Sequence, residues 1–400
     1  MVRPPGPGSS ERPSPAEDPD DARLRRECWT ALALAEGLGA VRIGRAWRAF
    51  DRDVRRMATA RHPPDDEAEK VTSDAWGRIR AALSPAGRRD ARHYLDAWTA
   101  RGPAPIHPED PAYPPLLART VDPPPLLFVR GRLPQGTAAA PAASRVVAVV
   151  GTRTASPWAL SFARGVSAEL ARAGVCVASG LALGVDAAAH AGALDAAPDA
   201  TIAVLGSSLD RVHPARHQPL ADRIAQRSAV VSEHPPGTNA YPGSFPRRNR
   251  IVSGLARAVL MVEGREGSGV RHTVRFANDE GREVFVVPQR PDGPKGRYAA
   301  SLLADGATPF VGTAELIAAV SGLAEAAAPH ATAPPTGAVS AIPDDPAARR
   351  LLALLSDGTP RPLDALLPAG MPAGRLLALL TRLELAGLVT PDGRGGWRRA

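Results

Sequence analysis

Cysteine is scarce in this 400-residue sequence, which contains only Cys28 and Cys176. The two cysteines are far apart and belong to no CxxC or His-Cys cluster, so neither a disulfide framework nor a zinc site is available. We therefore expect no metal and no cofactor. A reducing compartment fits this composition.

Long hydrophobic runs are also missing, although 44% of the residues are hydrophobic. The longest apolar stretches, such as residues 146–150, have the length of a strand, whereas a membrane-spanning helix needs about 20 apolar residues. The first 20 residues are polar and rich in Pro and Ser, without the apolar core of a secretory signal. These absences predict a cytoplasmic globular protein of two or three domains, with no membrane partner.

Lysine is rare as well: Lys70 and Lys295 are the only two, and arginine supplies nearly all the positive charge. Basic residues exceed acidic ones by 49 to 41, which gives a net charge of +8. This excess favours an anionic partner, with nucleic acid as the first candidate. A GC-rich genome would produce the same arginine bias, so composition alone leaves the partner open.

Composition and periodicity divide the chain into five segments. Residues 1–20 resemble a disordered tail, and residues 21–104 predict a small helical domain of the SAM or helix-hairpin-helix type. Its Gly-Leu-Gly turn at residues 37–39 either offers N–H groups to a phosphate or simply caps a helix, and capping is the commoner use. After the main block, an Ala/Pro-rich linker and a winged-helix domain are expected at residues 324–345 and 346–400. The partner of the winged-helix domain, DNA or protein, stays open.

The main block, residues 105–323, alternates short apolar runs with amphipathic segments of helix length. The runs are residues 146–150, 175–178, 201–205, 229–232, 259–262 and 284–287. This alternation predicts an α/β fold with an extended Rossmann-like, doubly wound parallel sheet. Because right-handed crossovers bring the turns after these strands to one edge of the sheet, we expect the ligand site there.

The turns after the first two strands carry possible ligand-binding residues. Gly151 and Arg153 stand with several hydroxyl residues where a helix begins, an arrangement that suits an anion. A tight turn with a solvated arginine is the alternative. Ser179 and Gly180 follow the second strand, where an NAD site would need an acidic ribose reader, so an NAD site is disfavoured.

The segment after the second strand also contains a candidate acid/base pair. Gly180 and Gly184 allow backbone to approach a ligand, and Asp186 and His190 fall one helical turn apart. The sequence places neither a nucleophile nor a metal ligand beside this pair. We therefore interpret Asp186 and His190 as structural residues.

The strongest signal in the residues themselves is the segment 241–255, which gathers Phe245, Arg248, Asn249 and Arg250 ahead of an apolar helix face. Arginine forks bind phosphate and an aromatic ring stacks on a base, which together suit single-stranded nucleic acid. The alternative is that Phe245 is a core residue beside solvated arginines.

A further turn, with Gly267, Ser268 and Gly269, can add phosphate-facing amides at the same edge. It resembles the Gly-x-Gly-Thr-x-x-Glu motif of nucleotide-processing phosphoribohydrolases, which makes such an enzyme one alternative. Three residues beyond Thr273, however, stands Phe276 instead of the catalytic glutamate, which disfavours that chemistry.

Seven motifs follow one another along the chain: VAVVGTRTASPWAL, VASGLALGVDAAAHAGAL, TIAVLGSSLDRVHP, VVSEHPPGT, FPRRNRIVSGLARAVLMVE, GSGVRHT and GREVFVVP. In this order they resemble the DNA-processing protein A (DprA/Smf) family, over roughly residues 105–312. The resemblance implies a non-enzymatic protein that binds single-stranded DNA, protects incoming strands during natural transformation and helps to load the RecA recombinase. It also implies a homodimer.

The resemblance assigns roles to individual residues. The family's phosphate-binding arginine falls on Arg153, and its FPxRNR element on residues 245–250. The full predicted DNA-binding set is Gly151, Arg153, Ser179, Gly180, Gly184, Phe245, Arg248, Asn249, Arg250, Gly267, Ser268 and Gly269. Asp186, His190 and Glu233 are predicted structural residues of the same pocket.

The chain departs from the family pattern at several positions. Val212-His213 precedes a proline where Tyr is usual, Val270-Arg271 replaces Ser-Leu, and Gln289 replaces a glycine. Arg271 and Arg297 add positive charge near these changes. We expect single-stranded DNA binding with altered contacts; a divergent protein with another anionic ligand and a scaffold without a ligand are the alternatives.

Overall fold

The computed structural model describes residues 18–64, 70–134, 144–289, 293–320, 346–356, 359, 361–366, 380, 383, 388–391 and 396–399. The chain divides into two compact units, Met1–Ala328 and Pro329–Ala400. The linker expected at residues 324–345 and most of the expected tail lie outside the described residues, and the domain boundaries stay a prediction. Within the described part, no helix combines the length and the apolarity needed to cross a membrane.

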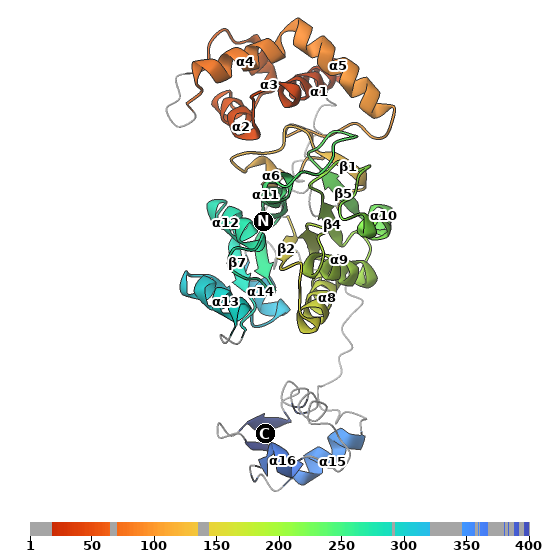
Figure 1. Ribbon diagram of the computed structural model, residues 1–400, viewed down its shortest axis with the longest axis vertical. Coiled ribbons are helices and arrows are strands. Elements are labelled where there is room, and N and C mark those ends of the chain that lie inside the picture. The colour runs from red at the N-terminus through yellow and green to blue at the C-terminus, as the bar shows by residue number, and fades with distance from the viewer. Residues whose placement is uncertain are drawn as a thin grey trace, which may run out of the picture. The chain divides into compact units, whose positions relative to one another are not determined.

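An eight-stranded sheet forms the centre of the first unit, in the order β1-β5-β4-β3-β2-β6-β7-β8 (Figure 1). The strands are β1 Phe128–Gly131, β2 Val146–Val150, β3 Cys176–Ser179, β4 Thr201–Val204, β5 Ala229–Ser232, β6 Ala258–Met261, β7 Glu283–Val286 and β8 Thr308–Pro309. All neighbouring strands run parallel except β1 and β5. The predicted α/β fold with a doubly wound, mostly parallel sheet is confirmed.

Six of these strands were expected from their apolar runs, and each forms within one residue of its predicted ends. The two edge strands, β1 and β8, were not expected. β1 lies in the Pro-rich connector and pairs antiparallel with β5, about 100 residues later in the chain. Its pairing is a long-range contact, which local periodicity does not reveal.

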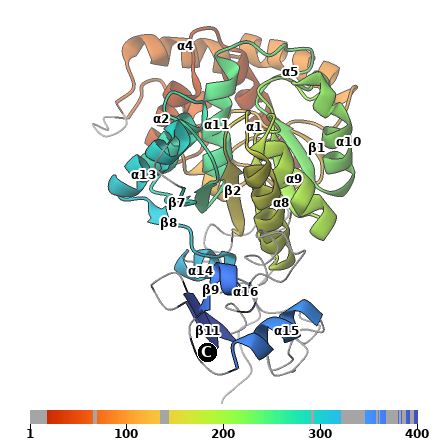
Figure 2. The same ribbon diagram turned by 60° about the horizontal axis from the view of Figure 1, so that its bottom comes forward.

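Both faces of the sheet are covered by helices, as Figures 1 and 2 show. In β2, Val146, Ala148 and Val150 belong to the core on one face, and Val147 and Val149 to the core on the other. The first face carries α11 Ser244–Leu255, α12 Val270–Asp279 and α13 Pro294–Ala304; the second carries α8 Pro157–Arg172, α9 Val185–Ala196, α10 Gln218–Arg227 and α14 Thr313–Ala319. Burial on both faces explains why the strands are continuous apolar runs.

The direction of winding reverses at β2. From β2 the chain adds β3, β4 and β5 on one side and then continues with β6, β7 and β8 on the other. The carboxyl ends of β2 and β6 are therefore neighbours at a topological switch point, where open α/β sheets bind their ligands. The turns that begin at Gly151 and Val262 both start from this point.

The N-terminal helices are α1 Pro19–Leu34, α2 Ala40–Ala49, α3 Val54–Thr59, α4 Ser73–Leu83 and α5 Pro85–Thr99. They enclose a core that contains Trp29 and Trp47 and also Phe128 of β1. Between α1 and α2, Gly37 has a φ of 73°, the left-handed conformation that ends a helix. The helices thus share a continuous apolar interface with the edge of the sheet.

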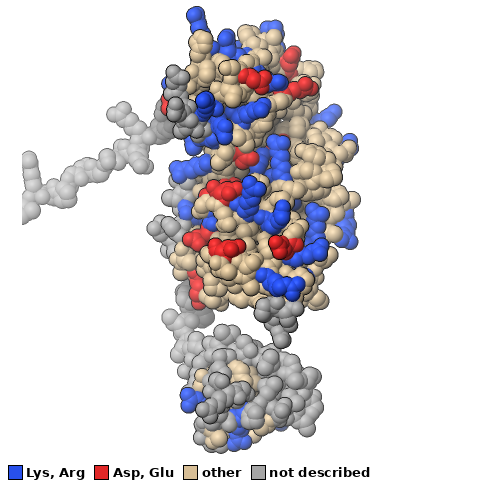
Figure 3. Space-filling view, turned by 60° about the vertical axis from the view of Figure 1, so that its left-hand side comes forward, with Lys and Arg blue, Asp and Glu red and all other residues tan. Residues whose placement is uncertain are grey.

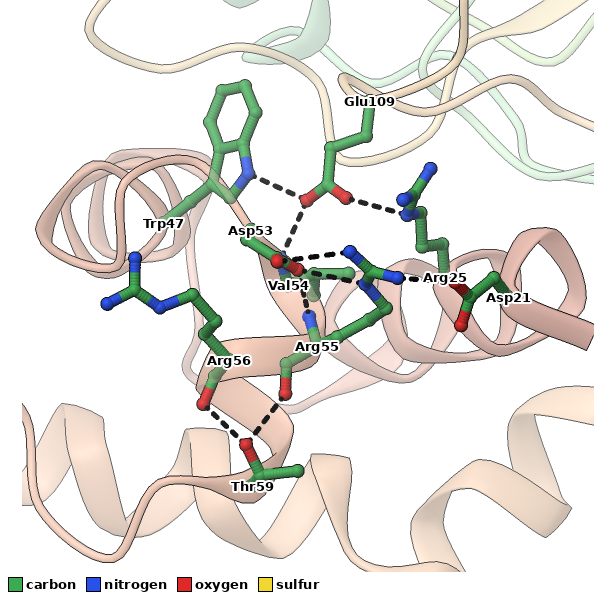
Figure 4. A network of polar contacts seen from close by, with 9 residues as sticks. All are labelled: Asp21, Arg25, Trp47, Asp53, Val54, Arg55, Arg56, Thr59 and Glu109. Atoms are coloured by element: carbon green, nitrogen blue, oxygen red, sulfur yellow. Dashed lines mark hydrogen bonds and ion pairs between the residues drawn. The ribbon is translucent and has the colours of Figure 1, made fainter. Parts of the chain in front are cut away.

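A single carboxylate links these helices to the connector that follows them. Glu109 accepts hydrogen bonds from Trp47 Nε1 at 2.8 Å and from the Val54 backbone N–H at 2.7 Å (Figure 4). Arg25 lies 3.4 Å from its other oxygen. Burial raises the pKa of Glu109, and the bonds from Val54 and Trp47 oppose that effect. Glu109 therefore joins α1, α2 and α3 to the chain that leads into the sheet.

The second unit contains α15 Pro346–Leu354, β9 Arg361–Pro362, α16 Leu363–Leu366, β10 Val389–Pro391 and β11 Gly396–Arg399. The three strands form an antiparallel sheet in the order β10-β11-β9. β10 and β11 pair directly and form the short C-terminal strand pair of the expected winged-helix domain. The apolar pattern at residues 371–389 predicts the third helix of the winged-helix domain, and most of these residues lie outside the described part of the chain.

Candidate nucleic-acid interface

A pocket of about 620 Å³ opens at the switch point. Turns after β2, β3, β5 and β6 line it together with the first residues of α9, α11 and α12. Nine predicted site residues are among its walls: Gly151, Arg153, Gly180, Asp186, Phe245, Arg248, Asn249, Ser268 and Gly269. The N-terminal ends of three helices meet here, and helix N-termini favour anions.

Two glycines allow the turns to approach one another closely. A Cβ atom on Gly180 would lie 2.5 Å from Nη2 of Arg248. Gly184 has a φ of 79°, and a Cβ there would lie 2.3 Å from the carbonyl oxygen of Thr152. Only glycine fits at Gly184 without strain, and a Cβ on Gly180 would displace the Arg248 guanidinium, so both residues shape the pocket although Gly184 does not line it.

Arg248 and Asp186 form the floor of the pocket. Arg248 is 4% exposed, and its Nη1 donates to the carbonyl oxygens of Gly180 and Val204. Burial lowers its pKa to about 10, so the guanidinium keeps its charge at neutral pH. Asp186 accepts from the N–H groups of Gly180 at 3.2 Å and Ala182 at 3.3 Å. Burial raises the pKa of Asp186, and the charge of Arg248 opposes that shift.

Arg153 and Phe245 lie beside each other at the surface of the pocket. Arg153 is exposed, and its guanidinium carbon lies 5.4 Å from the centroid of the Phe245 ring. Phe245 is only half-buried, which fits an accessible ring better than a core anchor. A cation and an aromatic face are thus presented together at the pocket surface.

Arg250 and Glu233 are not in the pocket, contrary to the position expected for them. Arg250 is 2% exposed, lies 3.1 Å from Asp122 through Nε and is bonded to Glu233 through Nη2. Residues two apart on a helix face different directions, so α11 cannot turn both Arg248 and Arg250 toward one site. The Arg250 charge serves a buried ion cluster that ties α11 to the turns at Asp122 and Glu233.

Three other predicted residues also lie outside the pocket wall. His190 is fully buried and shares a 2.7 Å hydrogen bond with Thr201, not with Asp186. Burial lowers its pKa to about 3. Ser179 donates to the Val149 carbonyl at 2.7 Å and so links β3 to β2. Gly267 has a φ of 77° and permits its turn. None of these three residues lines the pocket.

Sequence reasoning missed several lining residues. Arg265 is exposed in the wall, and Thr152, Thr154 and Ala182 complete the turns. Arg265 stands in the same Gly-rich turn as Ser268, and its charge in that turn was an available signal. Arg271 and Arg297, by contrast, are exposed but do not line the pocket.

One of the two lysines holds the turn after β2 in place. Lys295 donates to Glu263 at 2.8 Å and to the Thr154 carbonyl at 3.1 Å, and Glu263 also accepts from the Ser156 N–H at 2.9 Å. Burial alone would raise the pKa of Glu263, but the bonds from Lys295 and Ser156 outweigh it and lower that pKa. Gln289, which replaces a glycine of the family pattern, donates to the Val262 carbonyl at 2.8 Å and so stabilises the same edge of the sheet.

Charge alone does not mark this site. On the face in Figure 3, basic side chains are spread over the molecule with acidic ones between them. The charged residues that line the pocket are three arginines, Arg153, Arg248 and Arg265, and one acid, Asp186. The local excess of positive charge at the switch point, together with the aromatic ring, distinguishes the site.

Comparison with known proteins gives matches over most of the chain. Residues 104–321 match the family model of DNA recombination-mediator protein A, and residues 327–393 match that of the DprA winged helix domain. Protein Smf of Escherichia coli is 37% identical over 297 residues, 72% of this chain and 76% of that protein. Protein Smf of Synechocystis is 31% identical over 302 residues, 76% of this chain and 74% of that protein.

The structural comparison agrees. The X-ray structure of DNA processing protein A from Streptococcus pneumoniae superposes with a TM-score of 0.57 at 26% sequence identity, covering 74% of this chain and 98% of that one. The predicted resemblance is confirmed, and the chain belongs to the DNA recombination-mediator protein A (DprA/Smf) family.

Proposed function

We propose that this protein binds single-stranded DNA at the switch-point pocket and does so without catalysing a reaction. The observation that carries the proposal is the exposed Arg153 guanidinium against the half-buried ring of Phe245. Phosphates would contact Arg153 and Arg265, and the buried charge of Arg248 would add attraction from below. The N–H groups of the Gly-rich turns would complete the anion site.

The aromatic ring supports a preference for single strands. In a duplex the faces of the bases are covered by their neighbours, whereas an unpaired base can stack on a side chain. Phe245 lies beside the phosphate-binding arginine, so one nucleotide could engage both groups. Duplex DNA would keep only the phosphate contacts.

The wall chemistry favours binding over catalysis. Asp186, the carboxylate in the wall, is held by two backbone N–H groups above a buried arginine. His190 is bonded to Thr201 behind the pocket, where it cannot reach a substrate. Phe276 stands where a phosphoribohydrolase would have its glutamate. No paired nucleophile and base therefore face the ligand among the described wall residues.

Family membership supports a wider role. The DprA relatives are described as DNA processing proteins. We propose that the bound strand is protected during natural transformation or recombination and is passed to a RecA-type recombinase, with the protein acting in the cytoplasm as a homodimer.

Ile251 and Leu255 are buried in the core and cannot form the dimer surface. Exposed Trp158 and Val311, at 50% and 74% exposure, leave apolar surface for self-association.

Fluorescence anisotropy with a labelled oligonucleotide tests DNA binding. Single-stranded and duplex DNA of one length would be titrated across a salt series with wild type, Arg153→Ala, Phe245→Ala and the control Arg275→Ala. Arg275 is an exposed arginine on α12 outside the pocket wall. We expect Arg153→Ala to lower the single-strand salt slope by about 0.7, the value for one phosphate contact.

The Phe245→Ala variant is expected to lose about 1–3 kcal/mol of single-strand affinity, the usual contribution of one base stack, and little of its duplex affinity. Arg275→Ala should leave both unchanged. Equal binding of both DNAs by wild type, unaffected by the pocket variants, would show that the charge acts diffusely. Absence of DNA binding would leave a scaffold function, and release of free base from a nucleoside monophosphate would indicate a phosphoribohydrolase.

A further inference from the structure

A small cavity of about 50 Å³ adjoins the main pocket. The two share five wall residues: Arg153, Gly180, Ala182, Phe245 and Arg248. The small cavity is closed on its other side by Leu183, His213 and Pro214. The turn after β4, which contributes nothing to the wall of the main pocket, therefore reaches the site through His213.

His213 is held against the wall of the main pocket. Its ring centroid lies 5.1 Å from that of Phe245, at an angle of 46°. Arg153 is 5.4 Å from the same Phe245 ring, so the aromatic ring contacts both a guanidinium and an imidazole. His213 is itself exposed and free to meet a ligand.

The turn that carries His213 is fixed by contacts to the chain after β5. Ser208 donates to the Thr238 carbonyl at 2.9 Å, and the Gly237 N–H donates to Asp210 at 3.0 Å. Arg211 donates to the side chain of Asn239 at 2.7 Å. The position of His213 is therefore set by the fold before a ligand arrives.

The size and charge of the small cavity limit what it can hold. A cavity needs about 10–15 Å³ on this measure to hold one water molecule, so this one has space for a group of a few heavy atoms. Its charged wall residues are two guanidinium groups, Arg153 and Arg248, with no carboxylate in the described wall. A compact anion fits both conditions, and single-stranded DNA supplies one as its phosphate group.

We infer that His213 is a DNA contact: with Arg153 it binds one phosphate of the strand in the small cavity. This inference rests on the proposed single-stranded DNA function. A protonated imidazole donates a charge-assisted hydrogen bond to phosphate, and histidine is the side chain that ordinarily gains its proton between pH 5 and 8. The affinity for DNA should therefore rise as the pH falls through this range.

Several charged or titratable groups surround His213, and the variants at His213 separate its contribution from theirs. Arg153 from the turn after β2 and Arg248 from α11 line the small cavity, and Arg248 stays charged across this range. Asp186 of α9 accepts bonds from backbone N–H groups, and burial raises its pKa. His190 behind the wall has a pKa of about 3 and stays neutral. Asp210, Arg211 and Arg216 lie in the same turn or just after it. His217 is the neighbouring imidazole, and it is hydrogen bonded to the Leu181 carbonyl.

The test measures the affinity of the full-length protein for labelled oligo(dT) at pH 5.5, 6.5, 7.5 and 8.5. Thymine is chosen because it has no group that titrates in the acidic half of this range. The variants are His213→Gln, which cannot be protonated, and His213→Lys, which carries a fixed charge. His272→Gln, on α12 and outside both walls, is the matched histidine control. Circular dichroism at each pH verifies that the proteins are folded.

Wild type and His272→Gln should bind about fivefold more tightly at pH 5.5 than at pH 8.5, the upper range for one exposed ion pair. His213→Gln should show the wild-type affinity of pH 8.5 at every pH. His213→Lys should bind tightly at all four. The single-strand salt slope of wild type should also grow by about 0.7 at low pH.

Two results would overturn the role of His213 and leave the proposed function standing: a pH response in His213→Gln equal to that of wild type, or pH-independent binding by wild type. If wild type fails to bind oligo(dT) at every pH and salt concentration, the proposed function fails and the role of His213 fails with it. The two failures are thus separate outcomes of one titration.

Discussion

Arg248 and Arg250 are two residues apart on α11, yet they lie in different environments. The Arg248 guanidinium reaches the floor of the pocket and bonds the carbonyls of Gly180 and Val204. Arg250 points away into an ion cluster with Asp122 and Glu233. The FPxRNR element thus combines a site residue with a residue that fixes the helix presenting it.

Replacement of Arg250 should affect stability and not DNA contact. Arg250→Ala leaves Glu233 and Asp122 without their buried cation, which costs about 3–5 kcal/mol of unfolding free energy. Urea unfolding measures this loss. The folded fraction should bind single-stranded DNA with an affinity within about twofold of wild type. A loss of affinity at unchanged stability would instead identify Arg250 as a DNA contact.

Gly184 should tolerate substitution less well than another glycine in the same conformation. Gly184 and Gly237 both have positive φ, but only Gly184 would place a Cβ against neighbouring backbone, whereas Gly237 has open space. Gly237→Ala should cost about 1 kcal/mol of stability through strain, and Gly184→Ala several times more, because the turn after β2 must also shift. Thermal unfolding of the two variants compares the costs directly. Equal losses would show that strain alone matters.

Glu109 should be required to attach the N-terminal helices. Glu109→Ala leaves the Trp47 Nε1 and Val54 N–H donors without their acceptor, for a loss of about 2–4 kcal/mol. Glu109→Gln keeps an oxygen acceptor and should lose about 1 kcal/mol. Hydrogen exchange should show α2 and α3 losing protection first in Glu109→Ala. Uniform loss of protection across the sheet would contradict a local role.

Glu280, just after α12, should make stability depend on pH near neutrality. Burial raises its pKa to about 7 from a usual 4.5, with the Arg282 charge opposing the shift. The folded protein therefore holds this proton more tightly than the unfolded chain, and the stability it contributes below pH 4.5 is lost as the pH rises to 7. The loss is at most about 3 kcal/mol.

Urea unfolding from pH 4.5 to pH 8 tests the role of Glu280. The neutral variant Glu280→Gln should keep its unfolding free energy where that of wild type declines. If both proteins show the same decline, another group is responsible. Glu263 cannot be that group, because its pKa is lowered and its contribution changes only at lower pH.

Most of the sheet could be predicted because it is encoded locally. A strand buried on both faces must be apolar throughout, and the runs at β2 to β7 met that condition. β1 and β8 are short edge strands whose pairing depends on residues far away in the sequence. Periodicity carries no information about such contacts, so these strands were missed.

The sequence by itself determined the family, six of the strands and the turns that meet at the switch point, because crossover handedness brings those turns to one edge. Only the tertiary structure decided which side chains of those turns line the pocket. Arg248 entered the pocket and Arg250 did not, and His190 was buried. Arg265, which no motif had marked, lines the pocket, and His213, noted only as a departure from the family pattern, lines the small cavity beside it. The reason is physical: helix direction and packing between distant turns fix the orientation of a side chain, and neither is written in local residue spacing.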